Sequence, residues 1–288
     1  MAGSEALGVI GGSGLYEIDA LTDVRTERVE TPYGDPSDDY VTGRLGDQRL
    51  VFLPRHGRGH KVAPHEINYR ANIYGMKKLG VSRLLAISAV GSMRAEIVPG
   101  HFVVVDQFID RTNGREASFF EKGMVGHVSF ADPVCASLAQ LAVAAARELD
   151  VTVHDGGTYV CINGPQFSTR AESNLYRSWG VDVIGMTNVT EAKMAREAEI
   201  CFCTVALATD YDCWYEGHDD VDVTSVLKII SKNVGNARRL VVQVAKTLPP
   251  LDADCACQNA LKHAILSSPE GITDDARVRL APLMKKYE

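Results

Sequence analysis

Two aspartates, Asp210 and Asp212, directly follow an apolar segment at 200–207. In an extended backbone, residues two positions apart project to the same side, so we expect the two carboxyl groups to lie close together. Their mutual repulsion raises the pKa of one carboxyl and keeps a proton available for a leaving group. The pair therefore predicts acid catalysis, with a polar turn as the alternative. A metal pair is disfavoured, because no histidine or third carboxylate has the right spacing.

A dense cationic stretch, RHGRGH at 55–60, follows another apolar segment at 49–54. The planar fork of Arg55 suits phosphate, and His56 adds a hydrogen bond. Zinc ligation by His56 and His60 is disfavoured, because the glycines between them break the helix that such spacing uses. The stretch is also too short, in an acidic chain, to indicate nucleic-acid binding. It predicts a phosphate site, with a solvated loop as the alternative.

The glycine cluster GGSG at 11–14 ends the first apolar segment. A P-loop is excluded because no lysine precedes Lys61, and the dinucleotide fingerprint lacks its third glycine. What remains is a tight turn whose backbone N–H groups form an anion nest, with the Ser13 hydroxyl as a further donor. The turn fits one free phosphate-sized anion, and a plain glycine turn is the alternative.

Three further polar segments also end predicted strands: 88–92 (SAVGS), 163–172 (NGPQFSTRAE) and 185–188 (GMTN). In the second, Ser168 or Thr169 with Glu172 resembles a capping box at the start of a helix. Phe167 is either a core residue or a ring that stacks on a flat base. Together these segments supply hydroxyl, aromatic and thioether groups at the strand ends.

The composition, with 45% hydrophobic and 23% charged residues over 288 positions, is typical of a soluble globular protein. The formal net charge of −7 disfavours bulk attraction to nucleic acid or to an anionic membrane. We expect neither a secretion signal nor a membrane span, because the start lacks a cationic lead and the apolar runs are short. Seven scattered cysteines indicate buried thiols in a cytoplasmic protein. Cys255 and Cys257 are read as two half-buried thiols, with a disulfide or redox clip as the alternative.

Strand-like and helix-like segments alternate along most of the chain. Strands are expected at 7–10, 49–54, 83–90, 102–108, 157–162, 181–185 and 200–207, and helices at about 65–79, 133–149, 169–179, 189–198 and 222–247. This alternation predicts one α/β domain, residues 1–250, with a central mixed β-sheet flanked by helices. Beyond it, residues 251–288 are expected to form a tail that packs on the same domain, with short helices at about 254–265 and 273–286.

Seven motifs in order between residues 8 and 247 resemble the trimeric purine nucleoside phosphorylase family, and within it the S-methyl-5'-thioadenosine phosphorylases. They are GVIGGSGL, ETPYGDPSD, LPRHGRGHKVAPHEINYRANI, GSMRAEIVPGHFVVVDQFIDRT, NGPQFSTRAES, DVIGMTNVTEAKMAREAEI and ATDYDCW. The resemblance implies phosphorolysis of S-methyl-5'-thioadenosine to adenine and 5-methylthioribose 1-phosphate. It further implies a homotrimer, with a hexamer as the alternative, which uses orthophosphate as a co-substrate and neither a metal nor an organic cofactor.

The same resemblance implies roles for individual residues. The phosphate site would be formed by Ser13, Arg55, His56, Ala89 and Thr187. Met186, with Ser88 nearby, would contact the ribose, and Phe167 and Ser168 the purine. Asp210 would face N7 as the proton donor, and Asp212 the exocyclic amine. Val223 and Val226 would line the 5'-alkylthio pocket, and His127 would reach into the site of the neighbouring subunit.

Relatives that prefer 6-oxopurines usually place an asparagine at the position of Asp210, so this chain is expected to favour a 6-aminopurine. The alternatives are a purine nucleoside phosphorylase acting on adenosine, inosine or guanosine, a methylthioinosine phosphorylase, and a non-catalytic nucleoside-binding protein. Two departures stand out. Gln166 occupies a position where some relatives have arginine, and Ser13 replaces a threonine while keeping the hydroxyl.

Overall fold

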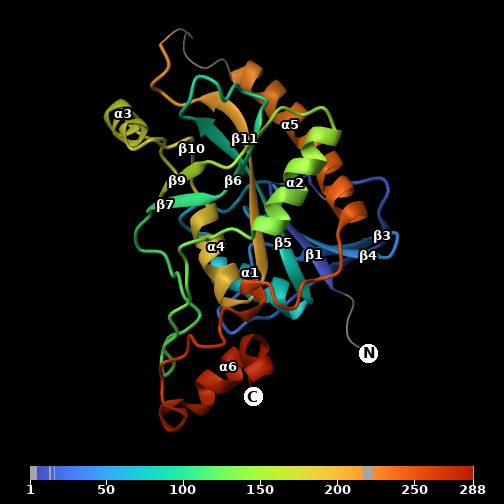
Figure 1. Ribbon diagram of the computed structural model, residues 1–288, viewed down its shortest axis with the longest axis vertical. Coiled ribbons are helices and arrows are strands. Elements are labelled where there is room, and N and C mark those ends of the chain that lie inside the picture. Colours follow the sequence, from blue (N-terminus) through green and yellow to red (C-terminus); the bar gives the residue numbers. More distant parts are fainter. Residues whose placement is uncertain (1–4, 13, 16, 217–222, 288) are drawn as a thin grey trace.

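The computed structural model describes residues 5–12, 14, 15, 17–216 and 223–287, excepting the side chains of 223–228 and 269. Within these residues, eleven strands form one mixed sheet with helices around it (Figure 1). The sheet confirms the predicted fold class. Its strands are β1 (Ala6–Gly11), β2 (Thr22–Glu27), β3 (Tyr40–Leu45), β4 (Gln48–Pro54), β5 (Val81–Ser92), β6 (Phe102–Val105), β7 (Gln107–Arg111), β8 (Val153–Asp155), β9 (Thr158–Ile162), β10 (Val183–Gly185) and β11 (Cys201–Tyr211).

Helices cover both faces of this sheet. They are α1 (Tyr69–Lys78), α2 (Ala136–Glu148), α3 (Arg170–Ser178), α4 (Asn188–Glu197), α5 (Val223–Thr247) and α6 (Asp274–Met284). On one face α2 and α5 pack against β11 and bury Leu138 and Leu240. On the other, α1 and α4 bury Ile73 and Met194. Burial on both faces explains the near-continuous apolar character of the central strands. Among the described helices, none is long and apolar enough to cross a membrane.

Four strands at the centre of the sheet run parallel, side by side in the order β4, β1, β5 and β11. Gly11 of β1 pairs with Pro54 of β4, and Ser88 of β5 pairs with Ala206 of β11. Parallel strands present their carboxyl ends at the same edge, which is where α/β proteins hold their ligands. The register therefore gathers the glycine turn, the cationic loop and the aspartate pair at one edge of the sheet.

The segment 102–108, predicted as one strand, forms two strands that separate at Asp106. β6 pairs with β11 and β8, whereas β7 pairs with β9. The side chain of Asp106 accepts a hydrogen bond from the backbone N–H of Gly157 at 3.1 Å. Hydrophobicity predicts that a segment is a strand but says nothing of which neighbour each half pairs with.

The strands β2, β3 and β8 were not predicted. All six residues of β2 are exposed or half-buried, and β2 is the outermost strand beside β3. Such a strand has no buried face to reveal it in a hydrophobicity pattern. The helices α1 and α2 also begin later than predicted, at Tyr69 and Ala136. Asn68 caps α1 by accepting a hydrogen bond from the backbone of Ala71.

The tail contains less helix than expected. In place of a helix over 254–265, the chain forms a 3₁₀ turn, Ala256–Asn259, followed by further turns. The Asn259 side chain donates to the carbonyls of Ala253 and Cys255, and such local bonds compete with helix formation. α6 lies within the second predicted helix, and its Leu280 packs into the same buried cluster as α1 and α4.

Candidate active site

The glycine turn and the cationic loop are joined at the carboxyl ends of β1 and β4. The backbone N–H of Arg55 donates to the carbonyl of Gly11 at 2.9 Å. A Cβ on Gly11 would lie 2.3 Å from Cδ1 of Leu15 and 3.1 Å from the carbonyl oxygen of Ile87, so a larger residue here would require the neighbouring groups to shift. Arg238 of α5 donates from Nε to the carbonyl of Gly14 at 2.7 Å and fixes the turn from the opposite side. Ser13, the predicted side-chain donor, lies outside the described residues.

Arg55 is buried, and its guanidinium forms a bidentate ion pair with Glu191 at 2.7 and 2.9 Å. The carbonyls of Ile87 and Ile10 accept two more of its N–H groups, at 2.6 and 3.3 Å. Burial alone lowers the pKa of Arg55, but the Glu191 carboxylate outweighs it and the pKa is raised. Four of the five N–H groups of the guanidinium are thereby used within the described part of the chain, leaving one on Nη1.

His56, beside Arg55, is held neutral. Burial and the Arg55 charge lower the pKa of His56 to about 4. Its Nδ1 lies 2.8 Å from the carbonyl of Val62, which can only accept, so Nδ1 carries the proton. In this tautomer Nε2 is an acceptor. It therefore suits the P–OH group of monohydrogen phosphate rather than a bare phosphate oxygen.

The predicted aspartate pair lies at the carboxyl end of β11, next to Gly91 of β5. A Cβ on Gly91 would lie 3.3 Å from Oδ1 of Asp210 and 3.5 Å from Cβ of Asp212, so both aspartates flank this glycine. The strand register shifts between Ala208 and Asp210, which forms an irregularity of the kind that re-aims side chains near active sites.

The two carboxyl groups have different partners. The hydroxyl of Thr209 lies 2.7 Å from Oδ2 of Asp210, and the hydroxyl of Ser168 donates to Oδ2 of Asp212 at 3.0 Å. Burial raises the pKa of Asp210, and the neighbouring Asp212 charge adds to the rise. Asp210 is thus the member of the pair that is suited to hold a proton.

The surroundings of the pair are open in a region where the sheet is otherwise buried. Ala89 is exposed within the central strand β5, between the buried residues Ser88 and Val90. Phe167 is 85% exposed, so it is not a core residue and its ring is free to stack on a planar ligand. Thr169 caps α3 in a capping box with Glu172, as predicted.

Met186 and Thr187 lie where β10 leads into α4. A Cβ on Gly164, whose φ is +66°, would lie 2.6 Å from Sδ of Met186, so the loop before Phe167 packs directly on the thioether. Thr187 is the N-cap residue of α4 and makes no side-chain capping hydrogen bond within the described helix. Its side chain stands at the positive end of the helix dipole.

A model of the phosphorylase superfamily matches residues 6–246. The chain belongs to this superfamily. It is 58% identical over 284 residues to the S-methyl-5'-thioadenosine phosphorylase of Geobacter sulfurreducens, covering 98% of this chain and 99% of that one. It is 50% identical over 281 residues to the S-methyl-5'-thioadenosine phosphorylase of Koribacter versatilis, covering 98% and 96%.

Solved structures of the superfamily share the fold. A methylthioadenosine phosphorylase from an antarctic soil metagenomic library superposes with a TM-score of 0.92 at 44% identity, covering 97% of this chain and 98% of the other. The methylthioadenosine phosphorylase from Schistosoma mansoni, in complex with adenine, superposes with a TM-score of 0.85 at 36% identity, covering 91% and 99%.

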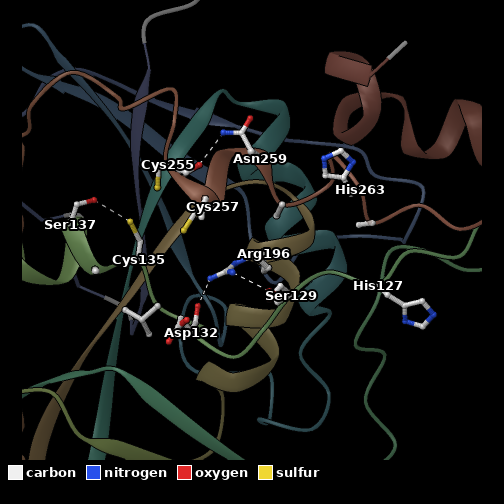
Figure 2. Close-up of a pocket in the computed structure, with 15 residues that line it drawn as sticks. His127, Ser129, Asp132, Cys135, Ser137, Arg196, Cys255, Cys257, Asn259 and His263 are labelled. Carbon is white, nitrogen blue, oxygen red and sulfur yellow. Dashed lines mark hydrogen bonds between the residues drawn. The ribbon is translucent and has the colours of Figure 1, made fainter.

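Three predicted site residues of this phosphorylase stand apart from the rest. His127 lies in the loop before α2, where its backbone N–H donates to the carbonyl of Ala264 in the tail, and it lines a cavity with His263 (Figure 2). This places it away from the aspartate pair of its own chain. Val223 and Val226 lie in the first turn of α5, and their side chains are outside the described residues.

Sequence reasoning missed three residues that hold this phosphorylase site in place. Glu191 orients Arg55, Thr209 contacts Asp210, and Arg238 holds the glycine turn. The sequence carries a signal only for Glu191, an acidic residue in the first turn of α4, where it suits the helix dipole. Arg238 contacts a segment 224 positions away, which no local pattern reveals. Thr209 adjoins Asp210 in the chain, but nothing in the sequence indicates that their side chains meet.

Proposed function

We propose that the chain catalyses phosphorolysis of S-methyl-5'-thioadenosine to adenine and 5-methylthioribose 1-phosphate. The observation that carries the proposal is Asp210, a carboxyl whose pKa burial raises, beside Asp212 and Ser168 at the same sheet edge as Arg55. It is supported by relatives at 58% and 50% identity that are themselves S-methyl-5'-thioadenosine phosphorylases.

The proposed reaction is a displacement at C1' of the ribose. Phosphate held near the glycine turn attacks C1' as the bond to adenine stretches, and the bound anion stabilises the oxocarbenium-like centre. Negative charge develops on the departing base. Asp210 relieves it by donating a proton to N7, a role that its raised pKa favours.

Phosphate would be bound by a few well-oriented groups. The remaining N–H on Nη1 of Arg55 supplies one charged hydrogen bond, and Glu191 fixes the direction in which it points. The Thr187 hydroxyl and the start of α4 supply further donors. Nε2 of neutral His56 accepts from P–OH, so the bound species is a protonated form of phosphate. Ala89 and the Ser13 hydroxyl would complete the site.

Selection of adenine would rest on Asp212 and Phe167. The Asp212 carboxylate accepts from the exocyclic 6-amino group, while the Ser168 hydroxyl holds the carboxylate in place. A 6-oxopurine would present an oxygen to this carboxylate and be repelled. Phe167 would stack on the base, Met186 and Ser88 would contact the ribose, and Val223 with Val226 would surround the methylthio group.

The proposal includes a cytoplasmic homotrimer that serves purine and methionine salvage and needs no metal or organic cofactor for the reaction. The position of His127, away from the aspartates of its own chain, supports a site shared between subunits. Seven cysteines present as free thiols are typical of a reducing compartment.

One assay tests the substrate assignment. Phosphate-dependent release of free base is measured with methylthioadenosine, adenosine and inosine under identical conditions. We expect methylthioadenosine to have the highest kcat/KM and inosine the lowest, because inosine lacks the 6-amino group. A preference for inosine would overturn the assignment of Asp212. Binding of methylthioadenosine without phosphate-dependent adenine release would show a nucleoside-binding protein instead.

A further inference from the structure

Four cysteines converge at the start of β11, and we refer to Cys135, Cys201, Cys255 and Cys257 as the cysteine cluster. Their Sγ atoms all lie within 4.8 Å of one another, and those of Cys201 and Cys255 are 3.7 Å apart. Figure 2 shows the sulfur atoms of Cys135, Cys255 and Cys257 directed toward one small region. Four sulfurs bound tetrahedrally to a zinc ion at about 2.3 Å are spaced by about 3.8 Å. The cluster therefore has nearly the dimensions of a tetrathiolate site.

Three separate segments deliver these thiols. Cys135 is the N-cap residue of α2, Cys201 is the first residue of β11, and Cys255 and Cys257 lie at the 3₁₀ turn of the tail. Asp210 lies nine residues further along β11, which corresponds to about 30 Å of extended chain. The cysteine cluster is thus remote from the candidate active site of its own chain, and the inference about it does not rest on the proposed function.

Three of the four thiols in the cluster are buried. Cys135, Cys201 and Cys257 are at most 5% exposed. Four thiolates this close together would repel one another. A divalent cation would replace the thiol protons and stabilise all four thiolates together.

We propose that the cysteine cluster is a structural zinc site that fastens the C-terminal tail to the sheet. Zinc is the cation that four thiolates in a closed tetrahedral arrangement favour. No metal is expected from the sequence, in which the four cysteines lack the paired C-x₂₋₄-C spacing of common zinc sites. Only the fold brings them together.

The surroundings fit a metal site in two further respects. Cys255 is half-buried and lines a cavity of about 710 Å³, so an ion can reach the cluster from solvent. Gln258 donates from Nε2 to Sγ of Cys201 at 3.5 Å, the kind of outer contact that orients a thiolate.

The expected consequence is a tail held by a metal link as well as by packing. The ligands span residues 135–257, so the ion would close long loops and its binding free energy would add to folding. The control residue is Cys203, two positions along β11 from Cys201, which is fully buried but outside the cluster.

Cobalt titration of the full chain tests the proposal. The protein is reduced, stripped of metal with a chelator, and titrated anaerobically with Co²⁺, whose visible absorption distinguishes tetrahedral four-sulfur ligation. We expect saturation at one Co²⁺ per chain, displacement by Zn²⁺, and loss of the four-sulfur spectrum in Cys255→Ser. Cys203→Ala is expected to bind Co²⁺ as the unaltered protein does. Metal removal should also speed proteolysis within residues 251–287.

Co²⁺ titration of the unaltered protein tests the proposal even if a variant fails to fold. Reduced, folded protein that binds no Co²⁺ while its thiols titrate as free would overturn the proposal. So would a mass showing that these cysteines are paired as disulfides in freshly purified protein. Binding that Cys203→Ala loses and Cys255→Ser retains would also contradict it, because the ligands would then be different residues.

Discussion

At the residue scale, the chemistry of the site depends on one carboxyl whose pKa is raised by burial. Asp210 is half-buried, contacts Thr209 and lies beside a second aspartate. Its pKa is raised above the usual value of 3.8 by burial. The native state therefore favours the protonated form, and this contribution to stability is present below pH 3.8 and is lost as the pH rises through the raised pKa. The raised pKa that suits Asp210 to proton donation therefore lowers the free energy of unfolding at neutral pH.

Replacing the carboxyl of Asp210 should separate its effect on catalysis from its effect on stability. Asp210→Asn is expected to lower kcat/KM for methylthioadenosine by about 10²–10⁴-fold, because the proton donor to N7 is lost. The same variant should unfold at a higher denaturant concentration than the unaltered protein at neutral pH, with the difference vanishing below pH 3.8. A nucleoside methylated at N7 is the control, because its base leaves without protonation and should be little affected. Equal losses on both substrates would contradict the assigned role.

The buried pair of Arg55 and Glu191 leads to a second prediction. Glu191→Ala leaves the Arg55 guanidinium, 2% exposed, without its counter-charge, and is expected to lower the free energy of unfolding by about 3–5 kcal/mol. Denaturant unfolding measures this loss. The double variant Arg55→Met with Glu191→Ala should recover part of the stability but not the affinity for phosphate. Recovery of phosphate affinity in the double variant would show that Arg55 does not bind phosphate.

At the element scale, the carboxyl end of α4 anchors the loop before α2. Glu197, the last residue of α4, accepts hydrogen bonds from the Phe119 backbone at 2.7 Å and from the Ser118 hydroxyl at 2.9 Å. Burial raises the pKa of Glu197 to about 7, although these two bonds lower it in part. The native state thus retains a proton that the unfolded chain releases from about pH 4.5.

A third prediction concerns this pH dependence. The stabilisation from protonated Glu197 is complete below pH 4.5 and is lost as the pH rises through about 7. Glu197→Gln is neutral at every pH and can keep both contacts. The free energy of unfolding of this variant should therefore exceed that of the unaltered protein by an amount that grows from acid to alkaline pH. Urea unfolding of both proteins on either side of pH 7 measures the difference. A difference independent of pH would mean that Glu197 does not titrate in this range.

At the scale of the whole molecule, the position of His127 bears on assembly. It lies beside the tail, while Asp210 lies at the carboxyl end of β11. If the proposed trimer places His127 in a neighbour's site, each active site needs two chains. We expect Asp210→Asn and His127→Ala, each impaired alone, to recover activity when the two chains are co-expressed in mixed trimers. Measured kcat that stays at the average of the two variants would show that each site is complete within one chain.

Much of this architecture could be predicted because central strands of a covered sheet are apolar on both faces. The segments 49–54, 83–90 and 200–207 coincide closely with observed strands, and the polar residues after them gather at one edge. The outer strand β2 and the split between β6 and β7 could not be predicted in this way. The strand β2 has no buried face. The split between β6 and β7 depends on which neighbouring strand each half pairs with.

The fold class, the family resemblance and the residue types at the site could be predicted, because they follow from local patterns of hydrophobicity and from motifs in order along the chain. Which groups favour the protonated form and which are already paired depends on tertiary contacts. Glu191 lies 136 positions from the Arg55 it binds, and the cysteine cluster draws on three distant segments. Burial and charge at such contacts arise only when the chain is folded, and they set the pKa of Asp210 and of His56.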